Sequence, residues 1–533
     1  MSQTNEICLT RLSGSELPSP ADTIYPGPME EAARIEVTSM LSTAVERPAH
    51  VLSKEKTITA IATLSAVSFL SSLSTGLLTI GLPRMAVEIG LPDYLIAWPS
   101  SVYTLASGSC LIIAGSIADV VGNRIVNTIG CFLVGCFIIA CGVARTGIEL
   151  IMFRAFQGVA VSLCLPTSVA IVASITTSGR ERNIGFSCLG FVQPIGFSLG
   201  LVLGGLLQDT AGWRVGWYIC GGLTMALFFI SLWALPVDEK TEGTVLLRLR
   251  RDVDWIGAIL SSASLALLSY VLGVMSSGVH NIAILGNIAA LTVGVLLIPS
   301  FIFWQRRQER REKPTLIPNS LWNNRTFTTV CLLVIFSYAV VNAMEFFCSL
   351  FFQNVQQLSA LQASLRILPS LIVGALVQVS TGLLIHRVPA FYLLLVSMIL
   401  SAGAPLLMAT ISVHQPYWFN AFFAQLVSPV SADILFTVGL LVVSDVFPAR
   451  MQALAGAVFN TVAQFGTSVG LTIMAVIAAS ITNGSKLQDK NSPDALMSGY
   501  RASFWAAFTW MGLACLIGAC GLRKIGMVGL KRD

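Results

Sequence analysis

Apolar residues fill most of the chain in runs of about twenty, and short polar segments separate these runs. A bilayer core of about 30 Å is crossed by about 20 helical residues at about 1.5 Å each, so each run is long enough to span a membrane. Fourteen such runs are predicted: 58–82, 94–117, 125–144, 150–172, 184–207, 216–235, 255–275, 282–304, 327–352, 365–385, 390–411, 418–443, 453–481 and 503–522. The pattern predicts an all-α polytopic membrane protein.

Composition agrees with lipid as the solvent for this chain. Hydrophobic residues make up 55% of the sequence and charged residues only 11%, whereas soluble domains carry about 25% charged residues. The basic residues form short loop clusters without interleaved aromatic side chains, so nothing indicates a nucleic-acid partner. We therefore expect the lipid bilayer to be the main partner of the surface.

Cysteine and histidine usage indicates neither a metal site nor a cofactor. Eleven of the twelve cysteines lie in or at apolar runs, and only Cys8 lies outside them. The four histidines are scattered, and no pair of cysteines has metal-ligand spacing with them. We interpret the cysteines as small packing residues.

The positions of Lys and Arg predict the topology. With the N-terminus in the cytoplasm, 24 of the 32 basic residues fall in cytoplasmic segments, six in external segments and two, Arg154 and Arg366, in helices. This bias favours cytoplasmic N- and C-termini. The basic run at residues 306–311 is read either as a contact for anionic lipid or as an ordinary inside-retention signal.

The order of runs and linkers suggests two repeats separated by an insertion. We expect a disordered cytoplasmic tail at residues 1–57, a six-helix bundle at 58–235, a linker with two additional helices at 236–314, a second six-helix bundle at 315–522 and a cytoplasmic tail at 523–533. The two bundles should be related as parallel repeats about an axis normal to the membrane.

Two glycosylation sequons lie on opposite sides of this predicted topology. The sequon at Asn324 falls on the cytoplasmic side and should stay unmodified. The sequon at Asn483 falls in the last external loop and is predicted to carry a glycan.

A polar turn between the second and third runs contains Gly115, Asp119, Gly122 and Arg124. Glycine permits a tight turn and close helix approach, and the Asp and Arg supply opposite charges. This segment resembles motif A, the gate motif of the major facilitator superfamily. Val120 and Asn123 stand where that family usually has basic residues, which weakens the expected charge relay.

The fourth run contains Arg154, Gln157 and Gly158, and a proline follows at position 166. An arginine inside a span needs a partner or a water-filled cavity. The segment resembles the family's motif B, in which the arginine is tied to proton coupling. The alternative is an arginine whose side chain extends to the interface.

Glycines spaced four apart follow a proline in the fifth run. Close helix approach is typical of such stripes. The residues resemble the family's motif C, found in exporters, although the usual Gly-Pro pair is altered; generic small-residue packing is the alternative. The residues are Pro194, Gly196, Gly200, Gly204 and Gly205.

Three further segments resemble the fourteen-span drug:proton antiporter branch of the family, in its fungal form: 254–257, 353–369 and 455–461. The resemblance implies the major facilitator fold, with two six-helix bundles and two extra central helices. It also implies that helix 1 carries an aspartate nine residues before a Leu-Pro pair. This chain has Ser74 there, so we expect the titrating acid elsewhere.

Two acids inside predicted helices are candidates for a proton carrier: Asp433, near the middle of the twelfth run, and Glu345, in the outer half of the ninth. A buried carboxyl group costs about 2.5–3.5 kcal/mol in a membrane helix on insertion scales, and burial favours its protonated form. A structural acid bonded to a neighbouring helix is the alternative. Phe346, Phe347 and Phe351 are read as packing residues or as contacts for an apolar substrate.

The resemblance predicts proton-coupled export of a drug-like or secondary-metabolite compound, with a small-molecule substrate and protons as partners. We expect a monomer, in the plasma membrane first and the vacuolar membrane second. Transport of a small inorganic or metabolic solute is the first alternative, and a non-transporting membrane sensor is the second. No catalytic constellation or nucleotide-binding loop indicates an enzyme.

Overall fold

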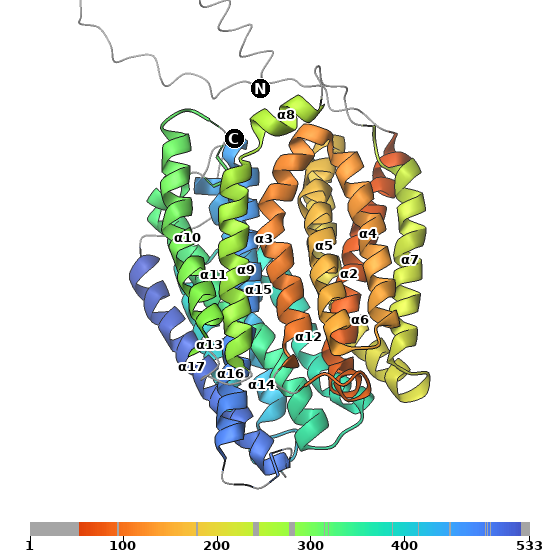
Figure 1. Ribbon diagram of the computed structural model, residues 1–533, viewed down its shortest axis with the longest axis vertical. Coiled ribbons are helices and arrows are strands. Elements are labelled where there is room, and N and C mark those ends of the chain that lie inside the picture. Colours follow the sequence, from red (N-terminus) through yellow and green to blue (C-terminus); the bar gives the residue numbers. More distant parts are fainter. Residues whose placement is uncertain are drawn as a thin grey trace, which may run out of the picture. The chain divides into compact units, whose positions relative to one another are not determined.

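The computed structural model describes residues 53–523 except 93–94, 177–179, 238–244, 277–282, 314, 318, 386, 414, 447–448, 486, 488 and 491. The tails predicted for residues 1–57 and 523–533 therefore lie almost entirely outside the described residues. Every predicted apolar run in the described part is helical (Figure 1).

The helices run back and forth between two ends of a bundle. They are α2 (Lys54–Glu88), α3 (Trp98–Val121), α4 (Asn123–Val143), α5 (Gly147–Ile175), α6 (Arg180–Thr210), α7 (Trp213–Ala234), α8 (Val245–Asp252), α9 (Trp255–Ser276), α10 (Leu285–Glu309), α11 (Arg325–Leu350), α12 (Ala360–Leu384), α13 (Ala390–Ala409), α14 (Ala421–Val427), α15 (Val430–Val446), α16 (Ala449–Gly484) and α17 (Pro493–Gly521). A 3-10 helix, η3 (Asn319–Asn323), precedes α11, and a π-helical turn, η4 (Phe351–Val355), extends it.

Thirteen described helices are long and apolar enough to cross a membrane, and α9 contributes a shorter apolar stretch, Trp255–Leu268. With α14 and α15 counted as one span, these segments give the fourteen predicted spans. We call the two ends of the bundle the Lys54 end and the Glu88 end, after the first and last residues of α2.

Three features differ from the predicted runs. The last helix begins at Pro493, ten residues before the predicted start, because a helix continues through the polar interface where its side chains reach water. The predicted linker contains the short basic helix α8, which is too brief for an apolar-run search. The twelfth span is interrupted at Ser428–Pro429, between α14 and α15.

Helix packing repeats between the two halves of the bundle. In the first half (α2–α7), α2 packs on α6, α3 and α4 pack on α5, and α4 packs on α7. In the second half (α11–α17), α11 packs on α16, α12 and α13 pack on α15, and α13 packs on α17. Each first-half pair has its counterpart in the second half, as expected for parallel repeats.

The halves meet through exchanged partners. Helix α3, the second span of the first half, packs on α16, the fifth span of the second half. In the same way, α12, the second span of the second half, packs on α6, the fifth span of the first half. The additional helices α9 and α10 pack on each other, and α9 also contacts α3 and α16 (Figure 1). Helices α2, α3, α6, α11, α12 and α16 therefore provide the contacts at the interface between the halves.

Candidate functional site

A small cavity with both polar and apolar lining residues lies at the interface between the halves. Its volume is about 30 Å³, enough for about one water molecule. Five helices contribute its lining: Thr75 and Thr79 of α2, Ser100 and Thr104 of α3, Phe197 of α6, Asn342, Glu345 and Phe346 of α11, and Thr467 and Leu471 of α16. Since the lining comes from both halves, any movement of one half against the other changes this cavity.

Among the described residues that line the cavity, Glu345 is the only carboxylate. Asn342, one helical turn earlier, faces the same space and donates hydrogen bonds to Tyr338 O (2.9 Å) and Thr467 Oγ1 (3.2 Å). The polar pairs 75/79 and 100/104 are each four residues apart, as residues on one helix face are. Sequence reasoning had selected Glu345 but had missed these hydroxyls, although their spacing was a usable signal.

Asp433 lies outside the lining of this cavity, in the first turn of α15. The Gln378 side chain of α12 donates a hydrogen bond to Asp433 Oδ1 at 3.1 Å. A Cβ on Gly374 would lie 2.6 Å from Asp433 Oδ2, so that glycine makes room for the carboxylate. Helix α11, which carries Glu345, packs on α15, which carries Asp433.

A helix break places Asp433 at a helix start. Pro429 has no N–H group, so it cannot continue the hydrogen-bond pattern of α14. Ser401 of α13 bridges the gap, because its hydroxyl donates to Val427 O (2.9 Å) and accepts from Ser431 N–H (2.9 Å). The unpaired N–H groups at a helix N-terminus favour negative charge, which suits an acid in that first turn.

Arg154 is fully buried inside the first half. Its guanidinium donates to Gln157 Oε1 (2.8 Å) and Pro99 O (3.2 Å), and its central carbon lies 4.1 Å from the centre of the Tyr103 ring. One guanidinium nitrogen, Nη2, has no hydrogen-bond partner among the described residues. The side chain is thus held in the protein interior and does not extend to the interface.

The position of the missing helix-1 acid belongs to the same network. Ser74 is buried, and its hydroxyl accepts from Gln157 Nε2 at 2.9 Å and donates to Ser71 O at 2.7 Å. Within the described residues, the hydrogen bonds of Arg154 go to uncharged groups. Arg154 therefore has no carboxylate among its hydrogen-bond partners in the described part of the chain.

The motif A residues form the turn between α3 and α4. Gly122 caps both helices with φ 117°, a backbone conformation that residues with a Cβ rarely adopt. Arg124 donates a hydrogen bond to the Leu232 carbonyl at the end of α7. Asp119 is exposed at the Lys54 end, and Gly115 packs near Pro166.

The glycines of α6 and α5 lie where helices touch. A Cβ on Gly196 would lie 2.4 Å from Phe69 O, and a Cβ on Gly200 would lie 2.2 Å from Leu73 O, both on α2. Gly204 faces α2 as well, whereas Gly205 faces Leu361 of α12. Gly158 of α5 packs in the same way on Tyr103 O, at 2.3 Å. Pro194 lies inside α6.

The reciprocal partner of this stripe, Gly76 of α2, was missed by sequence reasoning. A Cβ on Gly76 would lie 2.3 Å from Phe197 O. A single glycine in a helix gives no sequence signal, because only the facing backbone shows why it is needed.

Hydrogen bonds join the halves near the Glu88 end. Ser349 Oγ donates to Thr79 O (3.0 Å), Gln353 Nε2 donates to Ile80 O (3.1 Å), Leu361 N–H donates to Asp209 Oδ2 (3.3 Å), and Ser468 Oγ donates to Ser101 O (3.0 Å). Thr472 Oγ1, whose proton goes to Ser468 O, accepts from Ser101 Oγ (3.2 Å). We call this set the Glu88-end seam. It closes one end of the interface on which the cavity lies.

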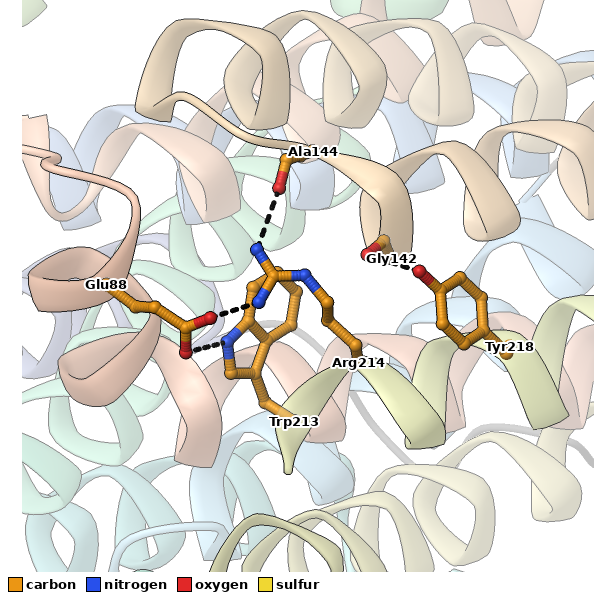
Figure 2. A network of polar contacts seen from close by, with 6 residues as sticks. All are labelled: Glu88, Gly142, Ala144, Trp213, Arg214 and Tyr218. Carbon is orange, nitrogen blue, oxygen red and sulfur yellow. Dashed lines mark hydrogen bonds and ion pairs between the residues drawn. The ribbon is translucent and has the colours of Figure 1, made fainter. Parts of the chain in front are cut away.

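Polar groups also tie the first half together at this end. Glu88 forms an ion pair with Arg214 and accepts from Trp213 Nε1 at 2.8 Å, and Arg214 also donates to Ala144 O at 3.2 Å (Figure 2). Tyr218 donates to Gly142 O at 3.1 Å nearby. Because the ion pair is partly exposed, it adds little stability, but it connects α2, α7 and the α4–α5 turn.

Other candidate residues have structural positions. Arg366 donates to Gln356 Oε1 at 2.6 Å and lies over the Tyr417 ring at 5.4 Å. Phe346 lines the cavity, whereas Phe347 packs against other aromatic rings, including Phe504, and Phe351 packs against Phe352. Asn483 is exposed at the end of α16, and Asn324 caps α11 by accepting from Phe327 N–H.

A larger hollow of about 470 Å³ lies outside the interface between the halves. Its lining comes from the end of α10 and from η3: Arg306, Glu309, Arg310, Asn319, Trp322 and Asn323. Both charge signs occur there, at the Lys54 end. None of its described lining residues belongs to the first half, so it does not lie between the two halves.

Comparison with known proteins is consistent with this geometry. A sequence model of the Major Facilitator Superfamily matches residues 64–471. MFS-type transporter 1 of Pyricularia oryzae is 40% identical over 525 residues, covering 90% of this chain and 85% of the relative. Two more distant relatives, each 25% identical, are a low affinity ammonium transporter of Saccharomyces cerevisiae over 429 residues and the efflux pump terJ of Aspergillus terreus over 438; each alignment covers 80% of both chains.

Solved structures show the same fold. A bacterial homologue of the human lysosomal transporter Spinster aligns with a TM-score of 0.62 at 13% identity, covering 89% of this chain and 99% of the other. The sequence match extends over most of the chain and includes the helices that line the cavity. The chain belongs to the major facilitator superfamily of membrane transporters.

Proposed function

We propose that this transporter exports an organic compound in exchange for protons and that Glu345 binds the proton. The observation that carries the proposal is the position of Glu345, a membrane-embedded acid in a cavity that both halves line. Ionisable groups inside membrane spans mark ion or substrate pathways. The efflux-pump name of the terJ relative supports export of an organic compound.

The mechanism follows from the electrostatics of that cavity. An ionised carboxylate at the interface favours access to water, because closing apolar helices over it removes its hydration. Protonation of Glu345 removes its charge and lowers the cost of taking it out of water. The halves can then close over the protonated side chain, so that the cavity exchanges access from one side of the membrane to the other. Asp433, at the start of α15, which packs on α11, serves as a second acid on the proton pathway.

The orientation of the protein belongs to the same proposal. The bias of basic residues supports a cytoplasmic Lys54 end, so that the Glu88-end seam closes the external side. Gly122 and the rest of the motif A turn then form the cytoplasmic gate. We further propose a monomer, in the plasma membrane first and the vacuolar membrane second.

Proteoliposomes containing the purified protein and an internal pH dye test the export proposal. Addition of a transported compound from a substrate panel should move protons in the wild type, whereas Glu345→Gln should abolish the signal and Asp433→Asn should reduce or abolish it. The matched control is Glu55→Gln, at an exposed acid in the first turn of α2. Full proton movement in a folded Glu345→Gln variant rejects the role of Glu345.

A second function, transport of a small inorganic or metabolic solute, is favoured by one observation. The cavity of about 30 Å³ is far smaller than the roughly 300–1,000 Å³ of pockets for drug-sized ligands. The name of the ammonium-transporting relative is consistent with a small solute. Uptake and export assays in the same vesicles, with gradients imposed in either direction, discriminate the two functions.

A further inference from the structure

Three of the five hydroxyl groups among the lining residues donate their protons to backbone carbonyls of the protein. Thr79 Oγ1 donates to Thr75 O at 2.9 Å, Thr75 Oγ1 donates to Ser71 O at 3.3 Å, and Thr104 Oγ1 donates to Ser101 O at 3.0 Å. The acceptors are backbone carbonyls, so the direction of each bond is fixed. These three threonines therefore present only oxygen lone pairs to a ligand.

The side-chain amide of Asn342 likewise uses its donor group inside the protein. Its nitrogen donates to Tyr338 O and Thr467 Oγ1, which leaves its carbonyl oxygen as an acceptor. An ionised Glu345 carboxylate adds acceptors and no donor. Among the described lining residues, the hydroxyls of Ser100 and Thr467 are the ones that donate to no protein acceptor and so remain possible donors to a ligand. The cavity is thus rich in acceptors and poor in donors.

An acceptor-rich cavity with one negative charge matches a small cation that donates hydrogen bonds. A carboxylate, or a neutral ligand without N–H or O–H groups, would leave the lone pairs of the lining residues without hydrogen-bond donors. Burying polar atoms without a partner costs free energy. A volume of about 30 Å³ admits a species about the size of water. An ammonium nitrogen supplies donors and positive charge within that volume.

We propose that the cavity around Glu345 binds an ammonium-type cation, the ammonium ion itself or the protonated nitrogen of a primary amine. This inference rests on the proposed role of the cavity as the transport site and specifies its ligand class. The cation and the proton compete for one carboxylate, because a protonated Glu345 has no charge to offer the cation. Phe346, Phe197 and Leu471 provide apolar walls for the carbon chain of an amine when the cavity opens.

Calorimetric titration and thermal unfolding of the purified full chain test the proposal. Ammonium chloride should bind saturably and raise the midpoint of thermal unfolding, as any ligand specific to the folded state does. Potassium chloride at the same concentration should do neither, because potassium is a monovalent cation without N–H donors. Equal binding of potassium would overturn the choice of an N–H donor.

Variants locate the site. Glu345→Gln should weaken ammonium binding by about tenfold or more, because a charge-assisted hydrogen bond is lost. Thr79→Val should weaken it by several-fold, whereas Thr292→Val, the same change at an exposed threonine of α10 with the same local bond at 2.8 Å, should not. Unchanged ammonium binding in both Glu345→Gln and Thr79→Val would overturn the proposal, and Thr79→Val alone decides it if Glu345→Gln fails to fold.

The outcomes separate this inference from the export proposal. If ammonium binds at Glu345 but no compound drives proton movement in proteoliposomes, the cation site stands and proton-coupled export fails. If a compound drives Glu345-dependent proton movement while ammonium does not bind, the export proposal stands and the cation site is rejected.

Discussion

At the residue scale, Arg154 is the most unusual group in the described part of the chain. It is fully buried, and its hydrogen bonds go to the Gln157 side chain and the Pro99 carbonyl. The Tyr103 ring supplies a cation–π contact, which is worth about 2 kcal/mol when desolvated. The guanidinium of Arg154 is thus held by uncharged partners. The family resemblance implies an aspartate in helix 1, where this chain has Ser74.

Ser74→Asp should stabilise the protein, because an acid at position 74 lies within the network of Gln157 and Arg154 and compensates the buried charge. We expect a gain of about 1–3 kcal/mol in the free energy of unfolding, seen as a higher midpoint of thermal unfolding in detergent. Ser74→Asn is the matched neutral control and should show no such gain. Equal midpoints for the two variants would contradict the prediction.

At the scale of elements, two helix features decide how closely the spans approach. Glycines of α6 contact the backbone of α2, and Ser401 of α13 satisfies the backbone groups at the break between α14 and α15. Neither feature depends on hydrophobic burial alone. In the first, backbone carbonyls of α2 lie against glycines of α6. In the second, the backbone groups of Val427 and Ser431 bond to the Ser401 hydroxyl.

Gly200→Ala should destabilise the contact between α2 and α6. The added Cβ would lie 2.2 Å from Leu73 O, so the helices must separate, at a cost of about 1–3 kcal/mol. Gly190→Ala, on the same helix, adds a Cβ with no neighbouring atom within 4 Å and should be neutral or slightly stabilising. Thermal unfolding of both variants checks the difference, and equal effects would show that close approach is unimportant.

Ser401→Ala should leave Val427 O and the Ser431 N–H group without their partner. We expect a loss of about 1–3 kcal/mol in the free energy of unfolding. Ser397→Ala, at a buried serine one turn earlier whose hydroxyl donates within its own helix to Leu394 O, is the control and should lose less. A similar midpoint of unfolding for the two variants would mean that Ser401 does not support the break.

At the scale of the whole molecule, the repeated packing of the halves and the Glu88-end seam suit alternating access. The seam holds one end of the interface closed through side chains of α3, α11, η4 and α16 and through the N-terminus of α12. Transport then requires these bonds to break together while the halves rock around the cavity.

A covalent bond across the seam should stop transport. The hydroxyls of Ser101 and Thr472 are 3.2 Å apart, so cysteines at both positions are close enough to cross-link. Oxidised Ser101→Cys/Thr472→Cys protein should lose flux in proteoliposomes and regain it on reduction, and either single variant should keep its flux. Undiminished flux in the cross-linked protein would exclude opening at this end.

Glycosylation tests the orientation. With the Lys54 end in the cytoplasm, Asn483→Gln should remove a glycan-dependent mobility shift on gels, whereas Asn324→Gln should leave that shift unchanged. Asn324 caps α11 by accepting from Phe327 N–H at 3.1 Å, so its substitution should cost about 1 kcal/mol of stability. A glycan at Asn324 and none at Asn483 would reverse the proposed topology.

The sequence by itself determined the number of spans, the helical class and the family, because a membrane requires about twenty apolar residues per crossing and the family motifs are local in the chain. It also selected Glu345, Asp433 and Arg154 as candidates, since any charge inside a span stands out. Helix ends were less well predicted, as α17 shows, because polar residues at the interface do not end a helix.

Only the tertiary structure decided which polar groups meet. Nothing in the sequence distinguishes Thr75, Thr79 and Thr104 from other threonines. They line the same cavity as Glu345 because α2, α3 and α11 meet there. Likewise, Ser74 joins the Arg154 network through Gln157. Helical periodicity specifies the face on which a side chain lies, but the packing of distant helices specifies what that face meets.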